Sequence, residues 1–206
     1  PAIASAWWVT PAMSCIESLD AEDFAALLTV ARDAIVRAVD GTSPAALPHM
    51  PPRCLAPGAS FVTLTQDDTL RGCIGSLEAR RALRDDVAAN ALAAAMQDPR
   101  FPPLARAELA RTAVEISVLG AAEPMRFADE SDFHARLRPG VDGLIIVHGE
   151  RRATFLPAVW RQLPDPRAFV AALRRKAGID ADLPLTALQI SRYITLQGPR
   201  APLRAG

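Results

Sequence analysis

The residues best suited to chemistry lie in one short stretch, residues 69–80, which reads TLRGCIGSLEAR. Cys73 stands there behind Arg71, with Gly72 before it and Gly75 two residues after it. If the stretch is an extended strand, alternate residues share a face, so Arg71, Cys73 and Gly75 point the same way. A neighbouring cation lowers the pKa of a thiol, and glycines leave room for a ligand or another backbone. The pattern predicts a reactive thiol at Cys73, tuned by Arg71, with Gly72 and Gly75 as binding positions.

The same residues also permit a purely structural interpretation. Free cysteines are among the most buried residue types and often act as small hydrophobes. Glycines within a strand can mark a bulge or close packing. On this interpretation Arg71 pairs with Asp67, Asp68 or Glu115 for structural reasons.

Catalysis by Cys73 would need a general base nearby, usually a histidine. His134 and His148 are candidates, but no local spacing links either of them to Cys73. Glu115 lies on the polar side of its predicted strand and is a second candidate partner for Arg71. The residues alone leave a functional pocket and simple packing both open.

A second group of candidates follows the next predicted helix. Asp98, Arg100 and Phe101 occupy a turn held between Pro99, Pro102 and Pro103. They are predicted binding residues of a cleft; the alternative is a helix cap, a salt bridge and a core aromatic. Because this turn and the Arg71–Cys73 stretch lie at the ends of one hairpin–helix unit, we expect them to meet in space.

Composition narrows the classes of function. The 206 residues carry 23 basic and 23 acidic side chains, so no net field draws the chain to nucleic acid or to a membrane. Three widely spaced cysteines make a poor disulfide framework and favour a reducing compartment. We therefore expect a cytoplasmic protein. His49 and Cys54 lack the spacing of a metal site, and no metal or cofactor is predicted.

Hydrophobic periodicity predicts a hairpin followed by a helix, twice, near residues 60–97 and 143–178. A helix precedes the first unit, with Asp20 as its N-cap and Gly41 as its stop. Hairpins with helices on one side favour an α+β fold. The expected organisation is an N-terminal arm (1–17, with Trp7 and Trp8), one domain of two lobes sharing one core (18–198) and a C-terminal tail (199–206).

Residues 70–119 resemble the core of the AMMECR-type domain, known in bacteria and archaea as AmmeMemoRadiSam system protein A. The hexapeptide LRGCIG is the hallmark of that family, and the stretches PGVDGLIIVHGERRATFLPAV and FVAALRRKAGI are similar to its second half. The resemblance extends over about residues 18–198. It implies a duplicated hairpin–helix unit around one curved, mainly antiparallel sheet. It also implies a Memo-like protein and a radical S-adenosylmethionine protein as partners.

Two hypotheses about function follow. The first is an accessory or partner-docking module with a small-molecule or peptide pocket near LRGCIG, acting alongside those two proteins. The second is a small enzyme or enzyme subunit that uses Cys73 as nucleophile, with Arg71 tuning it and Glu115 or a histidine orienting it. The missing local base and the missing cofactor motif favour the first.

Overall fold

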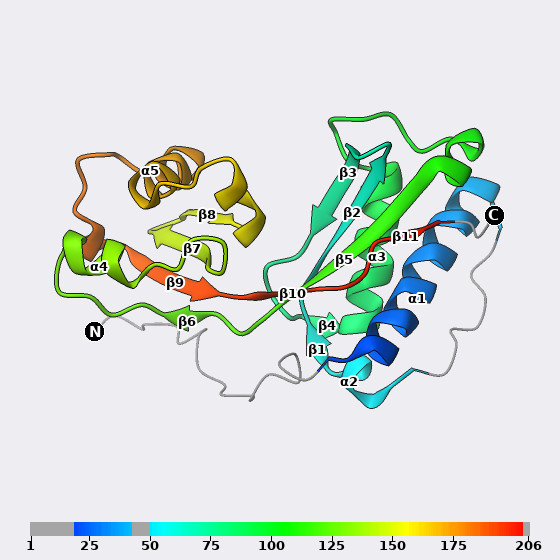
Figure 1. Ribbon diagram of the computed structural model, residues 1–206, viewed down its shortest axis with the longest axis horizontal. Helices are drawn as coiled ribbons and strands as arrows, with labels where there is room; N and C mark the ends of the chain where they lie inside the picture. Colours follow the sequence, from blue (N-terminus) through cyan, green and yellow to red (C-terminus); the bar gives the residue numbers. More distant parts are fainter. Residues whose placement is uncertain (1–18, 43–49, 204–206) are drawn as a thin grey trace.

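The main sheet of the first lobe is built from strands that alternate buried and half-buried residues. A computed structural model describes residues 19–42 and 50–203, and Figure 1 shows two lobes joined by extended segments. The strand order is β10-β5-β2-β3, with β11 also pairing with β5. All of these pairings are antiparallel. The strands are β2 (Ser60–Gln66), β3 (Thr69–Gly75), β5 (Thr112–Leu119), β10 (Thr195–Gln197) and β11 (Ala201–Pro202).

Two helices cover one face of this sheet, α1 (Ala21–Asp40) and α3 (Leu83–Met96) (Figure 1). The predicted cap of α1 is confirmed, because Asp20 accepts the backbone N–H groups of Glu22 and Asp23 at 2.9 and 3.1 Å. Gly41 ends the helix in the left-handed region at φ 68°. The first core lies between these helices and the inward-facing residues of β2 and β5, among them Val62, Leu64, Val114, Ile116 and Val118.

The segment between residue 50 and β2 contains two short elements. A short helix, α2 (Pro52–Leu55), buries Cys54 in the first core, and β1 (Pro57–Gly58) pairs with β4 (Arg81–Ala82) just before α3. After α3, the 3₁₀ helix η2 (Arg106–Arg111) leads into β5.

The second lobe repeats the hairpin and helix. Its antiparallel sheet has the order β6-β9-β7-β8. Asp165 caps α5 through the N–H of Ala168 at 2.7 Å, Pro166 is its first residue and Gly178 ends it. The elements are β6 (Glu123–Pro124), α4 (Glu130–Arg136), β7 (Gly143–His148), β8 (Arg151–Phe155), η3 (Pro157–Arg161), α5 (Pro166–Ala177), η4 (Leu185–Ala187) and β9 (Gln189–Tyr193).

Two extended segments connect the lobes. In one of them, β9 and β10 follow each other along the chain, but β9 belongs to the second sheet and β10 to the first. The chain from β5 to β6 crosses in the other direction, and the Gly120 N–H donates to the Ile194 carbonyl at 2.8 Å where the two segments pass. Figure 1 shows both crossings side by side between the lobes.

The α+β class, the antiparallel pairing and the two hairpin–helix units are confirmed. The strands form separate sheets, however, where one curved sheet was expected. The buried apolar residues form one cluster in each lobe and a smaller third cluster of Ala59, Leu119, Ile145 and Tyr193 between them. The third cluster forms because the strands of the two sheets end against each other at the crossing.

The predicted boundaries need one correction. Residues 199–206 were expected to be a tail, but β11 pairs with β5 and Leu203 is buried in the first core. The predicted N-terminal arm, with Trp7 and Trp8, lies outside the described residues.

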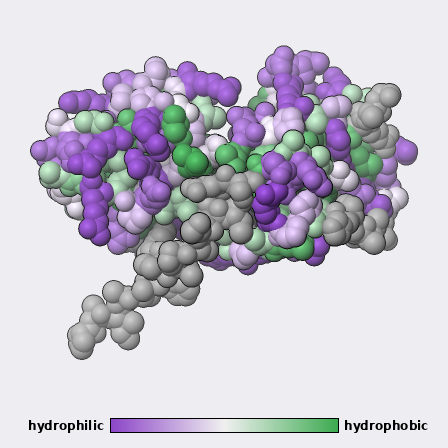
Figure 2. Space-filling view, turned by 60° about the horizontal axis from the view of Figure 1, so that its bottom comes forward, coloured by the Kyte–Doolittle hydropathy of each residue, from purple (hydrophilic) through white to green (hydrophobic). Residues whose placement is uncertain are grey.

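Hydrophilic residues dominate the face in Figure 2, and hydrophobic residues gather near the middle, where the lobes meet. Among the described residues, no helix combines the length and the apolar character needed to span a membrane.

Candidate functional site

A β-bulge at Arg71 decides which way Cys73 points. The turn at Asp67–Asp68, both with positive φ, pairs Thr65 with Leu70, but the next pair is Leu64 with Gly72. Arg71 is therefore the extra residue of the bulge. A shift of one residue moves every following side chain to the other face. Cys73 thus lies opposite Thr63 and away from the helices.

The face turned away from α1 and α3 is called the open face here. Directly paired residues across neighbouring strands point to the same side. One row runs Cys73, Thr63, Glu115 and the next runs Gly75, Phe61, Ser117. All six of these residues are half-buried. The open face is thereby defined by Phe61, Thr63, Cys73, Gly75, Glu115 and Ser117.

Arg71, which was expected to tune Cys73, forms its ion pair with Glu108. Its side chain is only 10% exposed and forms a two-pronged ion pair with Glu108, at 2.9 Å from Nε and 3.1 Å from Nη2. Its Nη2 also donates to the Pro102 carbonyl at 3.0 Å. These hydrogen bonds from Arg71 are the main reason that the pKa of Glu108 falls to about 2. Arg71 anchors the bulge to η2, and none of the predicted partners Asp67, Asp68 and Glu115 is the acid that it binds.

The two glycines of LRGCIG are explained by packing. A Cβ at Gly72 would lie 2.2 Å from the Ala94 carbonyl oxygen, so α3 sits directly against the strand. A Cβ at Gly75 would lie 2.3 Å from the ring of Phe61. The predicted binding role for Gly72 has no support, because this residue is buried against the helix backbone; Gly75 lies on the open face beneath an aromatic ring.

The turn after α3 binds the backbone of Cys73, so the Arg71–Cys73 stretch and the Asp98–Phe101 turn lie together, as expected. The Cys73 N–H donates to Asp98 Oδ2 at 2.9 Å, and Arg100 Nη2 donates to the Cys73 carbonyl at 3.3 Å. Arg100 and Asp98 also pair with each other at 2.7 Å. Hydrogen bonds, first from Arg100 and then from the Cys73 and Arg100 backbones, hold the pKa of Asp98 well below its usual range.

Phe101 completes this group. The guanidinium carbons of Arg71 and Arg100 lie 5.7 and 5.5 Å from the centre of its ring. Both distances fit cation–π contact. Phe101 therefore links the bulge to the turn, and Arg100, rather than Arg71, is the cation that contacts Cys73.

The Cys73 thiol contacts a hydroxyl group and has no hydrogen-bonded base among the described residues. Cys73 is partly exposed, and its Sγ lies 3.4 Å from Thr63 Oγ1. Within the described residues no histidine is hydrogen-bonded to it: His134 pairs with Glu130 and His148 is an exposed residue at the end of β7. Glu115 shares the open face but lies beyond Thr63 and binds Gln197. The arrangement resembles a binding surface more than an activated nucleophile.

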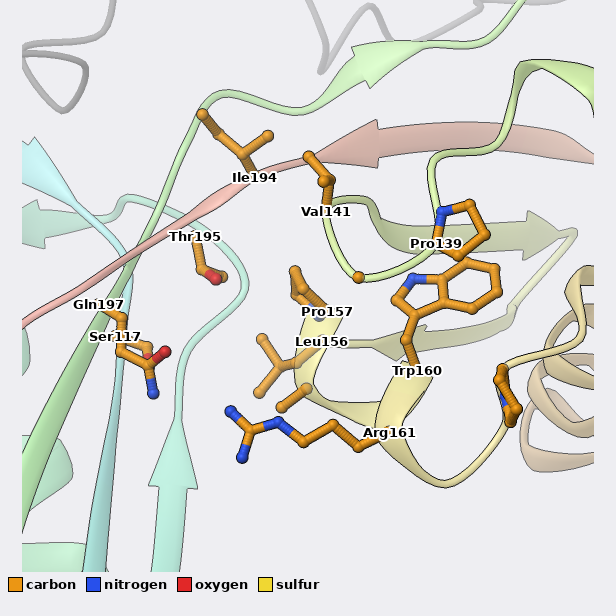
Figure 3. Close-up of a pocket in the computed structure, with 13 residues that line it drawn as sticks. Ser117, Pro139, Val141, Leu156, Pro157, Trp160, Arg161, Ile194, Thr195 and Gln197 are labelled. Carbon is orange, nitrogen blue, oxygen red and sulfur yellow. The ribbon is translucent and has the colours of Figure 1, made fainter.

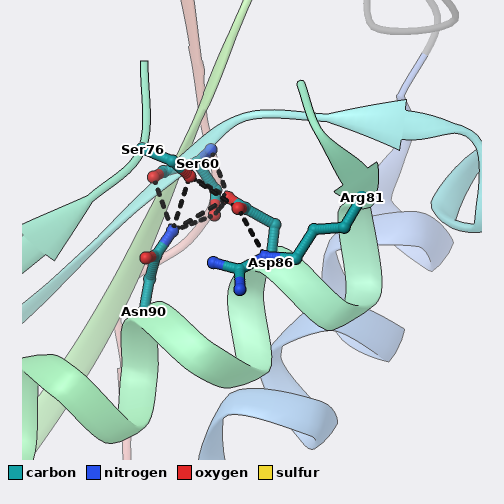
Figure 4. Close-up of polar contacts among 5 residues, drawn as sticks. All are labelled: Ser60, Ser76, Arg81, Asp86 and Asn90. Atoms are coloured by element: carbon teal, nitrogen blue, oxygen red, sulfur yellow. Dashed lines mark hydrogen bonds and ion pairs between the residues drawn. The ribbon is translucent and has the colours of Figure 1, made fainter. Parts of the chain in front are cut away.

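A buried polar network fixes the end of LRGCIG (Figure 4). Asp86 of α3 accepts the Ser60 N–H and hydroxyl at 2.8 and 2.7 Å and the Ser76 hydroxyl at 2.5 Å. Asn90 and Arg81 donate to the same carboxylate at 2.8 and 3.0 Å. Because each of these groups donates a hydrogen bond to Asp86, both oxygens of the buried carboxylate have partners. The network holds the start of β2 and the residue after β3 in place.

A cleft of about 570 Å³ lies between the lobes (Figure 3). The first sheet contributes polar residues, Ser117, Thr195 and Gln197. The second lobe contributes an apolar wall from η3 and the loop before β7, and Figure 3 shows Arg161 reaching into the gap. This wall includes Val141, whose side chain is unusually exposed for its type at 46%. The apolar lining includes Pro139, Val141, Leu156, Pro157, Ala158, Trp160, Pro164 and Ile194.

The open face and the cleft are continuous through Ser117, which belongs to both. Cys73 and Glu115 are separated by one strand, or about 10 Å at the usual strand spacing. Sequence reasoning missed Glu108, Thr63 and the cleft residues of the second lobe. The alternation of β2 was a usable signal for Thr63, whereas nothing local in the sequence indicates that η3 faces β10.

The part of the chain that the structure describes contains no candidate metal site. No group of three or more histidine, cysteine or acidic side chains is arranged to hold an ion there.

Comparison with known proteins agrees with this architecture. A family model described as AMMECR1 matches residues 28–196. A protein of Methanothermobacter thermautotrophicus is 37% identical over 158 residues, covering 76% of this chain and 82% of the relative. A protein of Thermofilum pendens is 32% identical over 180 residues, covering 80% and 83%.

The crystal structure of the uncharacterized protein PH0010 from Pyrococcus horikoshii has a similar fold. Its TM-score is 0.74 at 27% identity, over 87% of this chain and 94% of that one. The family match spans both hairpin–helix units, the LRGCIG strand and the crossing segments between the lobes. The chain therefore belongs to the AMMECR1 family.

Proposed function

We propose that this protein is an accessory binding module, in which the open face and the interlobe cleft hold a small molecule or a peptide segment. The observation that carries the proposal is the continuity of the two through Ser117. A ligand in the cleft meets hydrogen-bonding groups on one side and an apolar wall on the other. This combination is typical of sites for small molecules and extended peptides.

Binding is favoured over catalysis by the surroundings of Cys73. Its backbone N–H and carbonyl are occupied by Asp98 and Arg100, and its sulfur contacts a hydroxyl rather than a base. Cysteine-dependent catalysis remains the alternative hypothesis, and rapid turnover of a substrate with a covalent Cys73 intermediate would establish it.

The proposed setting is the AmmeMemoRadiSam system. The module would dock a Memo-like protein and a radical S-adenosylmethionine protein and present its ligand between them. This part of the proposal rests on the family resemblance of the LRGCIG region. A reducing, cytoplasmic setting is part of the same proposal and agrees with the free thiols of Cys54 and Cys73.

The test compares two alanines that are both exposed on 3₁₀ helices. Ala158 of η3 lines the cleft, whereas Ala107 of η2 does not line it. Affinity for Memo-like and radical S-adenosylmethionine proteins from the same genome would be measured by biolayer interferometry. Ala158→Trp should weaken binding at least tenfold and Ala107→Trp by less than twofold. Equal affinities for the two variants, or no binding by the unmodified protein, would contradict the proposal.

A further inference from the structure

A second cavity, of about 400 Å³, lies between α4 and α5 of the second lobe and shares no residue with the interlobe cleft. Its lining combines apolar residues with several basic ones. The apolar residues are Val170, Ala171, Ile179, Ala181 and Leu185, and the ionisable ones are Glu130, His134, Arg167, Arg174 and Arg175.

The three arginines lie on one side of α5 because they are seven and eight residues apart. Arg167 and Arg175 are exposed, and neither forms an ion pair with any acid in the described chain. Arg167 stands in the first turn of the helix, where a cation is disfavoured by the helix dipole. Helix stability therefore does not explain its presence.

Arg174 is the buried member of the group, only 8% exposed. Its Nη2 donates to the carbonyls of Asp180 and Leu183, but its buried Nε has no hydrogen-bond partner. His134 lines the same cavity, and its Nδ1 is likewise buried without a partner. Its Nε2 lies 3.5 Å from Glu130, whose carboxylate also lines the cavity. Buried polar atoms without partners are uncommon and destabilising, and two of them belong to side chains that line this cavity.

We propose that this cavity binds a small phosphate monoester with an apolar body. The lining contains three arginines and the Glu130 carboxylate, which lies beside His134, so it carries excess positive charge. A phosphate monoester carries close to two negative charges at neutral pH and several strong acceptor oxygens. Guanidinium groups match phosphate oxygens in geometry. The apolar wall from Val170, Ile179 and Leu185 would accommodate the organic part.

The test is a titration of the full chain with phenyl phosphate, followed by ¹H–¹⁵N NMR at pH 7.5 and low salt. Shifts at the amides of Ala171, Ile179 and Leu185 should saturate. The double variant Arg167→Gln/Arg175→Gln should weaken the apparent affinity at least tenfold. The control is the double variant Arg106→Gln/Arg111→Gln, which removes the same charge from exposed positions on η2. It should change the apparent affinity for phenyl phosphate less than twofold.

Two further probes test the two halves of the proposal. Phenol, which lacks the anion, and inorganic phosphate, which lacks the apolar body, should each bind at least tenfold more weakly than phenyl phosphate. Shifts that rise linearly without saturation, equal affinities for the two double variants, or equal binding of either probe would overturn it. Unchanged amide spectra of the free variants would show that these substitutions of exposed residues leave the fold intact.

Discussion

Asp98 accepts the backbone N–H of Cys73 at 2.9 Å, and its neighbour Arg100 donates to the carbonyl of the same residue. Because β3 is the edge strand of its sheet, these two groups would otherwise lack a strand partner. The Asp98–Arg100 pair occupies that place and joins the end of α3 to the LRGCIG strand.

Loss of this contact should destabilise the fold. The Asp98 side chain is 2% exposed, and Asp98→Ala leaves the part-buried Cys73 N–H and the Arg100 guanidinium without their acceptor, so it should lower the free energy of unfolding by about 2–3 kcal/mol. Urea denaturation measures the change. Asp33→Ala, which removes a half-exposed ion pair with Arg37, should cost less than about 1 kcal/mol and serves as control. Similar losses for both variants would argue against the edge role of Asp98.

The bulge should depend on the Arg71–Glu108 pair. Removing either partner leaves the other largely buried charge unpaired, so Arg71→Ala and Glu108→Ala should each cost about 3 kcal/mol. The double variant should cost clearly less than the sum. The exposed pair Arg136–Asp132 is the control, and its two single losses should simply add in the double variant. Additive losses at Arg71 and Glu108 would mean that the pair does not act as a unit.

Acid should weaken the same region. Hydrogen bonds from Arg71 lower the pKa of Glu108 from 4.5 to about 2. The ionised Glu108 therefore contributes fully to the free energy of unfolding above pH 4.5, and this contribution is lost as the pH falls toward 2. Urea unfolding between pH 7 and pH 2 should show this loss. In Glu108→Gln the slope between pH 4.5 and 2 should be smaller. An unchanged slope would assign the acid sensitivity to other carboxylates, with Asp98 the first candidate because its pKa is also lowered.

The two described cysteines, Cys54 and Cys73, should react with iodoacetamide at very different rates. Cys54 is fully buried, and desolvation, with Asp23 beside it, raises its pKa to about 11. Cys73 is partly exposed. In the native protein at pH 7.5, Cys73 should be modified at least a hundredfold faster, as measured by mass spectrometry of the peptides. Equal rates, or no reaction at Cys73 before unfolding, would mean that its thiol is closed to solvent.

Much of the first lobe was predictable because its signals are local. The cap at Asp20, the stop at Gly41 and the alternation of β2 and β5 each depend on residues close together in the sequence. The meeting of Cys73 with Asp98 also followed from the length of one hairpin–helix unit. The α+β class could be predicted from these local signals alone.

The roles of Arg71 and Glu115 could not be predicted in this way. A regular strand places Arg71 beside Cys73, but the bulge rotates it toward Glu108, which is 37 residues away. The interlobe cleft depends on how η3 packs against the crossing segments, and no short-range pattern encodes that. The division into two sheets is likewise decided by tertiary pairing of β9 and β10.

The central claim is that ligands or partners occupy the open face and the cleft beside it. The most direct measurement is the rate of Cys73 alkylation in the full chain, with and without a saturating Memo-like or radical S-adenosylmethionine partner from the same genome. Occupation of the open face predicts at least tenfold protection of Cys73 in the complex. An unchanged rate in a complex proven to form would contradict the claim.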